Sequence, residues 1–135
     1  METFAEVRQH IIENHKLFLD EPFQLGFEYA IDGSDRQQAI FVAELKAADN
    51  RRYLRVETLI CPLDDFDAEK CLRINLIQRV GYLAVGDLDG TAYIKMCENL
   101  PYKALDAKEL EYVIRQVAPM ADRMEQALES THDLA

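Results

Sequence analysis

The fold is decided by residues 23–31, FQLGFEYAI, where large apolar side chains occupy every second position. Small or polar residues alternate there with Phe23, Leu25, Phe27, Tyr29 and Ile31. A strand buried on one face has this period of two, whereas a helix repeats about every 3.6 residues. We therefore predict a half-buried strand over 23–31 and interpret the rest of the chain outward from it.

The residues before this strand have the pattern of a helix. Thr3 is a residue type that caps helices, and the apolar positions that follow have the spacing of one helical face: Phe4, Val7, Ile11 and Phe18. Pro22 has no backbone N–H group and ends a helix. We expect this helix to run from Thr3 to about Leu19.

Turn residues follow the first strand at 32–35 and occur again at Asp49 and Asn50. They bound the segments 38–47 and 53–61, which we predict to be the second and third strands of an antiparallel meander. Both of these segments carry apolar residues on both faces. Neither face is therefore marked by the sequence as the one in contact with water.

The second helix is predicted over 67–80, after Pro62 and an acidic cluster at 64–67. Gly81 suits the left-handed position that ends a helix. The helix has two apolar stripes instead of one, formed by Ala68, Leu72, Leu76 and Val80 and by Cys71, Ile74 and Ile77. Because a surface helix needs one stripe, we expect this helix to lie between its own sheet and something else.

A hairpin of strands over 82–85 and 91–97 follows, and a last helix begins at Asp106. The expected core face of that helix is Leu110, Val113, Ile114, Val117, Ala121, Met124 and Leu128, with a kink at Pro119 and a frayed end over 129–135. The prediction is thus an α+β fold of one domain, residues 1–135, in the order α-β-β-β-α-β-β-α. Its five strands form one twisted antiparallel sheet, with the first and third helices packed on one face.

The net charge and the apolar content of the chain limit the classes of partner that we expect. The 135 residues carry a net charge of −10, which disfavours nucleic acid and anionic membrane surfaces. The N-terminus lacks the apolar run of a secretory signal, and no apolar segment is long enough to span a membrane, so we expect a cytoplasmic protein. The three cysteines have no close-paired spacing, which argues against disulfides and zinc.

No motif predicts catalysis. The histidines lack metal-site spacing, and neither Ser34 nor Ser130 lies in a nucleophile elbow. Counted from Asp64, the acidic cluster lacks the glycine and glutamate of a calcium loop, so helix capping explains it. We therefore predict a non-enzyme with no catalytic residue, metal or cofactor, and we assign His10 and His15 to the polar face of the first helix.

The order of elements in an acidic chain of this length resembles the class I type III secretion chaperone fold and the related YbjN-like bacterial proteins. The most specific stretch is 71–124, CLRINLIQRVGYLAVGDLDGTAYIKMCENLPYKALDAKELEYVIRQVAPMADRM. There, a leucine-containing helix leads into a hairpin with an acidic-glycine turn and then into the LDAKEL start of the last helix. The resemblance extends over essentially the whole chain.

This resemblance implies a homodimer that binds a segment of a partner protein. A symmetric contact could use the stripe of Cys71, Ile74 and Ile77, although a helix of the same chain could cover that stripe instead. For the partner segment, an effector or another cytosolic protein, the candidates are Phe4, Val7, Ile11, Ile40 and Val42, and ordinary core positions are the alternative for these five.

Three functions follow from this pattern. The first is a non-catalytic, dimeric chaperone or adaptor that holds a partner segment. The second is a YbjN-like regulatory protein that acts on another cytosolic protein without a secretion system. The third is a small-molecule binder or enzyme, which requires a deep pocket with converging polar groups.

Overall fold

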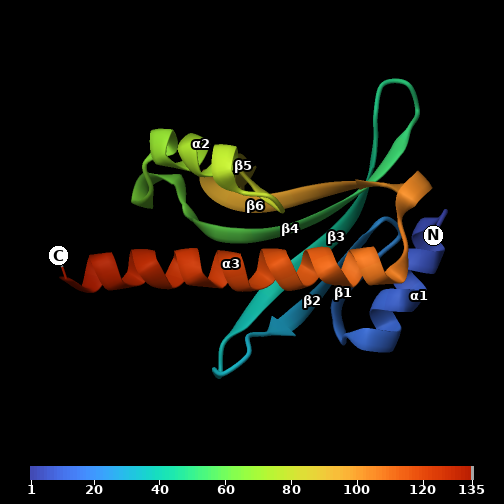
Figure 1. Ribbon diagram of the computed structural model, residues 1–135, viewed down its shortest axis with the longest axis horizontal. Helices are drawn as coiled ribbons and strands as arrows, with labels where there is room; N and C mark the ends of the chain where they lie inside the picture. The colour runs from blue at the N-terminus through green and yellow to red at the C-terminus, as the bar shows by residue number, and fades with distance from the viewer. Residues whose placement is uncertain (135) are drawn as a thin grey trace.

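The computed structural model describes residues 1–134, with side chains except those of Asp65 and 128–134. The helices are α1 (Phe4–Asn14), α2 (Ala68–Ile77) and α3 (Ala107–Leu134). The strands are β1 (Leu17–Glu21), β2 (Gln24–Ala30), β3 (Gln37–Lys46), β4 (Arg52–Pro62), β5 (Tyr82–Leu88) and β6 (Thr91–Pro101). The strands form one antiparallel sheet in the order β1-β2-β3-β4-β6-β5, and α3 runs across it (Figure 1).

The sheet has six strands, so the prediction of five was wrong at the N-terminal end. α1 stops at Asn14, and β1 pairs with β2 in a tight hairpin that includes Pro22. Phe18 fits the helical spacing of α1, but a strand directs it to the opposite side of the sheet from Leu17. Its ring lies over Gly26, where an added Cβ would come within 2.7 Å of the ring.

The predicted helix starts are confirmed. Thr3 Oγ1 accepts a hydrogen bond from Glu6 N at 3.2 Å, and Asp106 Oδ1 accepts one from Glu109 N at 2.7 Å. α3 continues on both sides of Pro119, and Figure 1 shows it as a straight helix, so the predicted kink is not seen. The expected frayed end over 129–135 lies outside the residues whose side chains are described.

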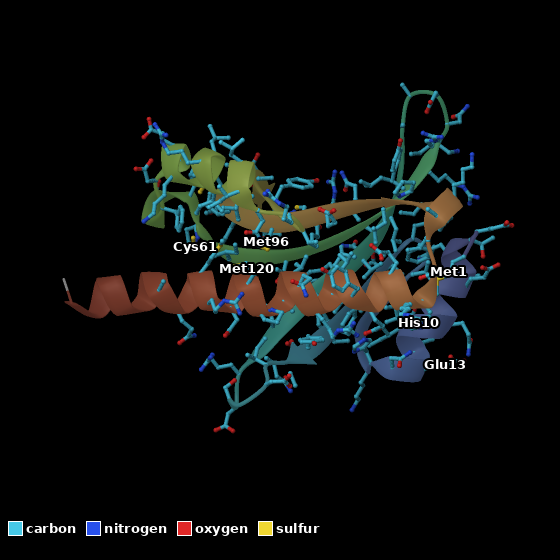
Figure 2. The ribbon with its side chains drawn as sticks, viewed as in Figure 1. Met1, His10, Glu13, Cys61, Met96 and Met120 are labelled. Carbon is cyan, nitrogen blue, oxygen red and sulfur yellow. The ribbon has the colours of Figure 1, made fainter. Side chains whose placement is uncertain are left out.

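One face of the sheet forms the core with α1 and α3. The predicted face of α3 is buried at Leu110, Val113, Ile114, Val117 and Ala121, while Met124 packs against the same core and the side chain of Leu128 is not described. Met96 of β6 and Met120 of α3 lie in the layer between the sheet and the helix (Figure 2). The strands contribute alternate residues to this layer, as a period of two requires.

Polar contacts also hold the helices in place. His10 Nε2 and His15 Nε2 both contact Glu111 Oε1, at 2.9 and 3.1 Å, which ties α1 and the residue after it to α3. Figure 2 labels His10 where α1 passes beside α3. Arg36, before β3, forms an ion pair with the buried Asp122 of α3 at 3.0 Å. Both histidines thus contact α3, and their side chains are largely buried instead of facing solvent.

Candidate protein-binding surfaces

The five residues predicted to bind a partner all lie in the core. Exposure is 5% for Phe4 and 0% for Val7, Ile11, Ile40 and Val42. Because they face the layer between the sheet and the helices, a partner could reach them only if that layer opened. The sequence-based assignment is therefore corrected to a core role, and the candidate surface has to be sought elsewhere.

α2 has two apolar stripes, as its sequence indicated, but most of the stripe predicted to form the interface faces the core. Cys71 is buried and Ile74 packs against the core, so two of the three predicted dimer residues face their own chain. The exposed apolar residues are instead Leu72 at 70%, Leu76 at 83% and Ile77 at 72%. We call Leu72, Leu76 and Ile77 the α2 stripe.

A side chain of α2 completes the edge of the sheet. Asn75 Oδ1 accepts a hydrogen bond from Leu83 N at 2.6 Å, and Asn75 Nδ2 donates one to Leu83 O at 3.0 Å. These are the two groups that a neighbouring strand would satisfy, and an unpaired edge invites other chains to add to the sheet. Asn75 therefore substitutes for a strand and fixes α2 beside β5, with the α2 stripe directed outward.

The α2 stripe is unusual for a helix of ten residues. A single exposed leucine is ordinary on a protein surface, because polar atoms are too few to cover it. Here three large apolar side chains are exposed on one short helix, and Cys71 is the helix residue that is buried. Burying such a side chain contributes about 1.5–3 kcal/mol, so the stripe is suited to contact with another protein surface.

The second candidate surface is the face of the sheet opposite α1 and α3, which we call the open face. Phe41 lies opposite Glu57 in the register, and Glu57 lies opposite Cys97. The Phe18 and Phe41 rings meet edge to face with centroids 5.7 Å apart. The open face thus carries aromatic side chains beside a charged group. For this reason the sequence alone does not show which face of the sheet is exposed to solvent.

A pocket of about 190 Å³ opens on this face. Its lining comes from five strands and comprises Gln24, Phe41, Glu57, Thr58, Leu59, Asp87, Leu88 and Lys95. Lys95 Nζ lies 3.4 Å from Glu57 Oε2 in a half-buried ion pair. Gly86 makes room for the lysine, because a Cβ at that position would come within 2.9 Å of the Lys95 side chain. We call this the open-face pocket.

Cys97 lies beside this ion pair and is not a reactive thiol. Its Sγ donates to Glu57 Oε2 at 3.8 Å. Burial, and next the negative charge of Glu57, raise the pKa of Cys97 to about 11. Nucleophilic cysteine chemistry needs the thiolate, and a raised pKa keeps the thiol protonated near neutral pH. Cys97 therefore serves as a small, buried apolar residue beside Glu57.

The described residues form neither a metal site nor a membrane span. Within that part of the chain, no group of three or more histidine, cysteine, aspartate or glutamate residues is placed to hold a metal ion. No described helix is both long enough and apolar enough to cross a membrane.

Of the exposed residues of α2, the sequence pattern assigned Ile77 to the interface, with Cys71 and Ile74, but placed Leu72 and Leu76 in the other stripe. The asparagine between Ile74 and Leu76 was the available signal, because a side chain that pairs with a strand edge marks the inward side of a helix. The open-face pocket was missed altogether. Opposite charges at Glu57 and Lys95 in two predicted strands hinted at a cross-strand pair.

Comparison with known proteins supports the fold. No protein-family model and no curated sequence matches the chain. A chain of the HopA1-SchA chaperone-effector complex aligns with a TM-score of 0.62 and 15% identity, covering 91% of this chain and 94% of that chain. YbjN from E. coli, described as a proposed transcription regulator, aligns with a TM-score of 0.54 and 14% identity, covering 93% and 87%. The chain therefore has the type III secretion chaperone-like and YbjN-like fold that its sequence predicted.

Proposed function

We propose that this protein is a non-catalytic chaperone or adaptor that forms a homodimer through the α2 stripe and holds a segment of a partner protein. The observation that carries the proposal is the exposure of Leu72, Leu76 and Ile77 on one short helix. The fold shared with a chaperone–effector complex supports it, because that fold accommodates a protein partner in at least one case.

A symmetric dimer would cover the exposed α2 stripe of both copies in one contact. A twofold axis brings the same patch together from both copies, so one apolar stripe provides both sides of the contact. The Asn75 bonds to Leu83 hold α2 in position before any partner arrives. Less conformational freedom is then lost on association, which favours binding through a small patch.

A second candidate is a regulatory protein that binds a different cytosolic protein through the same stripe. The fold shared with YbjN favours this alternative. With a net charge of −10, direct contact with DNA is disfavoured, so such a regulator would act on a protein. The oligomeric state separates the two candidates, because the regulator needs no second copy. Secretion genes beside the gene for this protein would favour the chaperone.

The test is the mass in solution, measured by light scattering, of the wild type, Leu76→Asp and Ile12→Asp. We expect a dimer for the wild type and a monomer for Leu76→Asp, since two carboxylates would be buried across the axis. Ile12 is an exposed apolar residue of α1 and provides the matched control, which should remain dimeric. Circular dichroism should show all three folded. A monomeric wild type, or a dimeric Leu76→Asp, would contradict the proposal.

A further inference from the structure

We propose that the open-face pocket receives one aromatic side chain of the partner segment, flanked in that segment by a basic residue. The inference rests on the proposed function, because it names the chemistry of the protein segment that is held. It concerns a surface separate from the α2 stripe, so the two claims can fail independently.

The size of the pocket suits one ring. A cavity of about 150 Å³ lined by aliphatic and aromatic side chains holds a benzene molecule. The open-face pocket measures about 190 Å³ and has Phe41, Leu59 and Leu88 among its lining residues. It is therefore large enough for the side chain of phenylalanine or tyrosine but too small for a typical metabolite or cofactor.

The residues that line the pocket favour an aromatic over an aliphatic side chain. The Lys95 ammonium group is held at Glu57 Oε2, with its stem lying over Gly86. A cation near the face of a ring is attracted by the ring electrons, and Phe41 can meet a second ring edge to face. An aliphatic side chain would gain burial but neither of these contacts.

The net charge of the whole protein selects the neighbour of that aromatic residue. Among the lining residues, the Glu57 carboxylate is paired with the Lys95 ammonium group, whereas the side chain of Asp87, two residues from Val85 on β5, is on the opposite face of the strand. The whole protein carries a charge of −10, so a basic segment is attracted from a distance and an acidic one repelled.

The occupant is an extended protein segment and not a free small molecule, because the pocket continues into exposed apolar surface. Phe18 is exposed and its ring contacts Phe41, which lines the pocket. Residues on either side of the anchoring ring could therefore lie along the open face. A free aromatic molecule would be buried in the pocket but would not contact this neighbouring surface.

The experiment is a titration of isotope-labelled full-length protein with synthetic peptides, followed through backbone amide shifts in NMR spectra. The probe is acetyl-Gly-Lys-Phe-Lys-Gly-amide. One control replaces its phenylalanine with alanine, and the other replaces both lysines with glutamate. We expect shifts centred on Phe41, Leu59, Leu88 and Lys95, with affinity at least about fivefold weaker for each control.

Paired variants locate the site. Leu88→Gln removes an apolar wall and should weaken the probe about fivefold. Val85→Gln is the matched control, because Val85 has similar exposure, 55% against 48%, but points to the other face of β5. Both residues are exposed, so both variants should fold as the wild type does.

Several results would overturn the inference. These are an absence of shifts, shifts centred on the α2 stripe, equal binding of the alanine or glutamate peptide, or equal loss with Val85→Gln. Shifts centred on α2 would show that the peptide binds there and not in the open-face pocket, while the proposal of protein binding would stand. The dimer measured by light scattering does not depend on any of these outcomes, so failure of the pocket and failure of the proposed function are distinguishable.

Discussion

α3 and α2 begin alike and are used differently. Each has an aspartate whose side chain caps the first turn, Asp106 in α3 and Asp67 in α2. α3 then buries an apolar face along the sheet and adds hydrogen-bond contacts through Glu111 and an ion pair through Asp122. In α2, Cys71 is buried and Asn75 forms hydrogen bonds with Leu83 of β5. Three large apolar side chains of this helix are exposed.

This difference separates two uses of apolar surface. The apolar face of α3 stabilises the chain to which it belongs. The α2 stripe contributes little to that chain, and it gains burial only when another surface covers it. Sequence hydrophobicity reports both helices as amphipathic, whereas burial in the folded chain shows which stripe is available to a partner.

The largest expected effect is on stability. Ile114→Ala in α3 should lower the free energy of unfolding by about 2–5 kcal/mol, because Ile114 is fully buried and its removal leaves a cavity. Leu72→Ala in α2 should change it by less than about 0.5 kcal/mol in dilute solution. Urea denaturation of both variants measures the contrast. Equal losses would mean that the α2 stripe belongs to the core.

A smaller effect on stability is expected when the hydrogen bonds that hold α2 against β5 are removed. Asn75→Ala removes two hydrogen bonds to Leu83 and should cost about 1–2 kcal/mol, mostly as easier local opening of β5. Faster hydrogen exchange at the Leu83 amide would report it. Asn99→Ala is the control, because Asn99 is exposed and accepts a bond from Arg55 on the open face. Unchanged exchange in Asn75→Ala would show that other contacts hold α2.

The smallest effect concerns the polar contacts of α3. Glu111→Gln keeps the shape of the side chain but removes the charge that faces His10 and His15. We expect a loss of about 0.5–1.5 kcal/mol in the free energy of unfolding. Glu13→Gln, at an exposed position of α1, should change it by less than about 0.5 kcal/mol. If the two variants are equally stable, apolar packing alone holds α1 against α3.

The sequence predicted most elements because local patterns determine them. The alternation over 23–31 predicted β2, and turn residues located the three hairpins that join β2 to β3, β3 to β4 and β5 to β6. Asp89 and Gly90 have the positive φ values that a tight hairpin turn needs. β1 was missed because Phe18 satisfies the spacing of α1. A five-residue strand is too short to outweigh a helix pattern, and its pairing with β2 appears only when the hairpin forms.

The candidate surfaces were harder to predict, because they depend on contacts between distant segments. Five apolar residues assigned to a partner proved to be core, since amphipathic stripes look alike whether they meet a sheet or a second protein. The open-face pocket joins residues from five strands, among them Gln24 and Leu88. No pattern within one segment encodes that proximity.

The most direct test of the central claim leaves the sequence unaltered. Hydrogen exchange of the α2 amides, residues 68–77, can be followed by mass spectrometry at protein concentrations from nanomolar to high micromolar. If α2 meets a second copy, its exchange should slow as the concentration rises, while that of α3 should stay constant. Exchange of α2 that stays independent of concentration, over a range in which the dimer dissociates to monomers, would contradict the claim that the α2 stripe forms the interface.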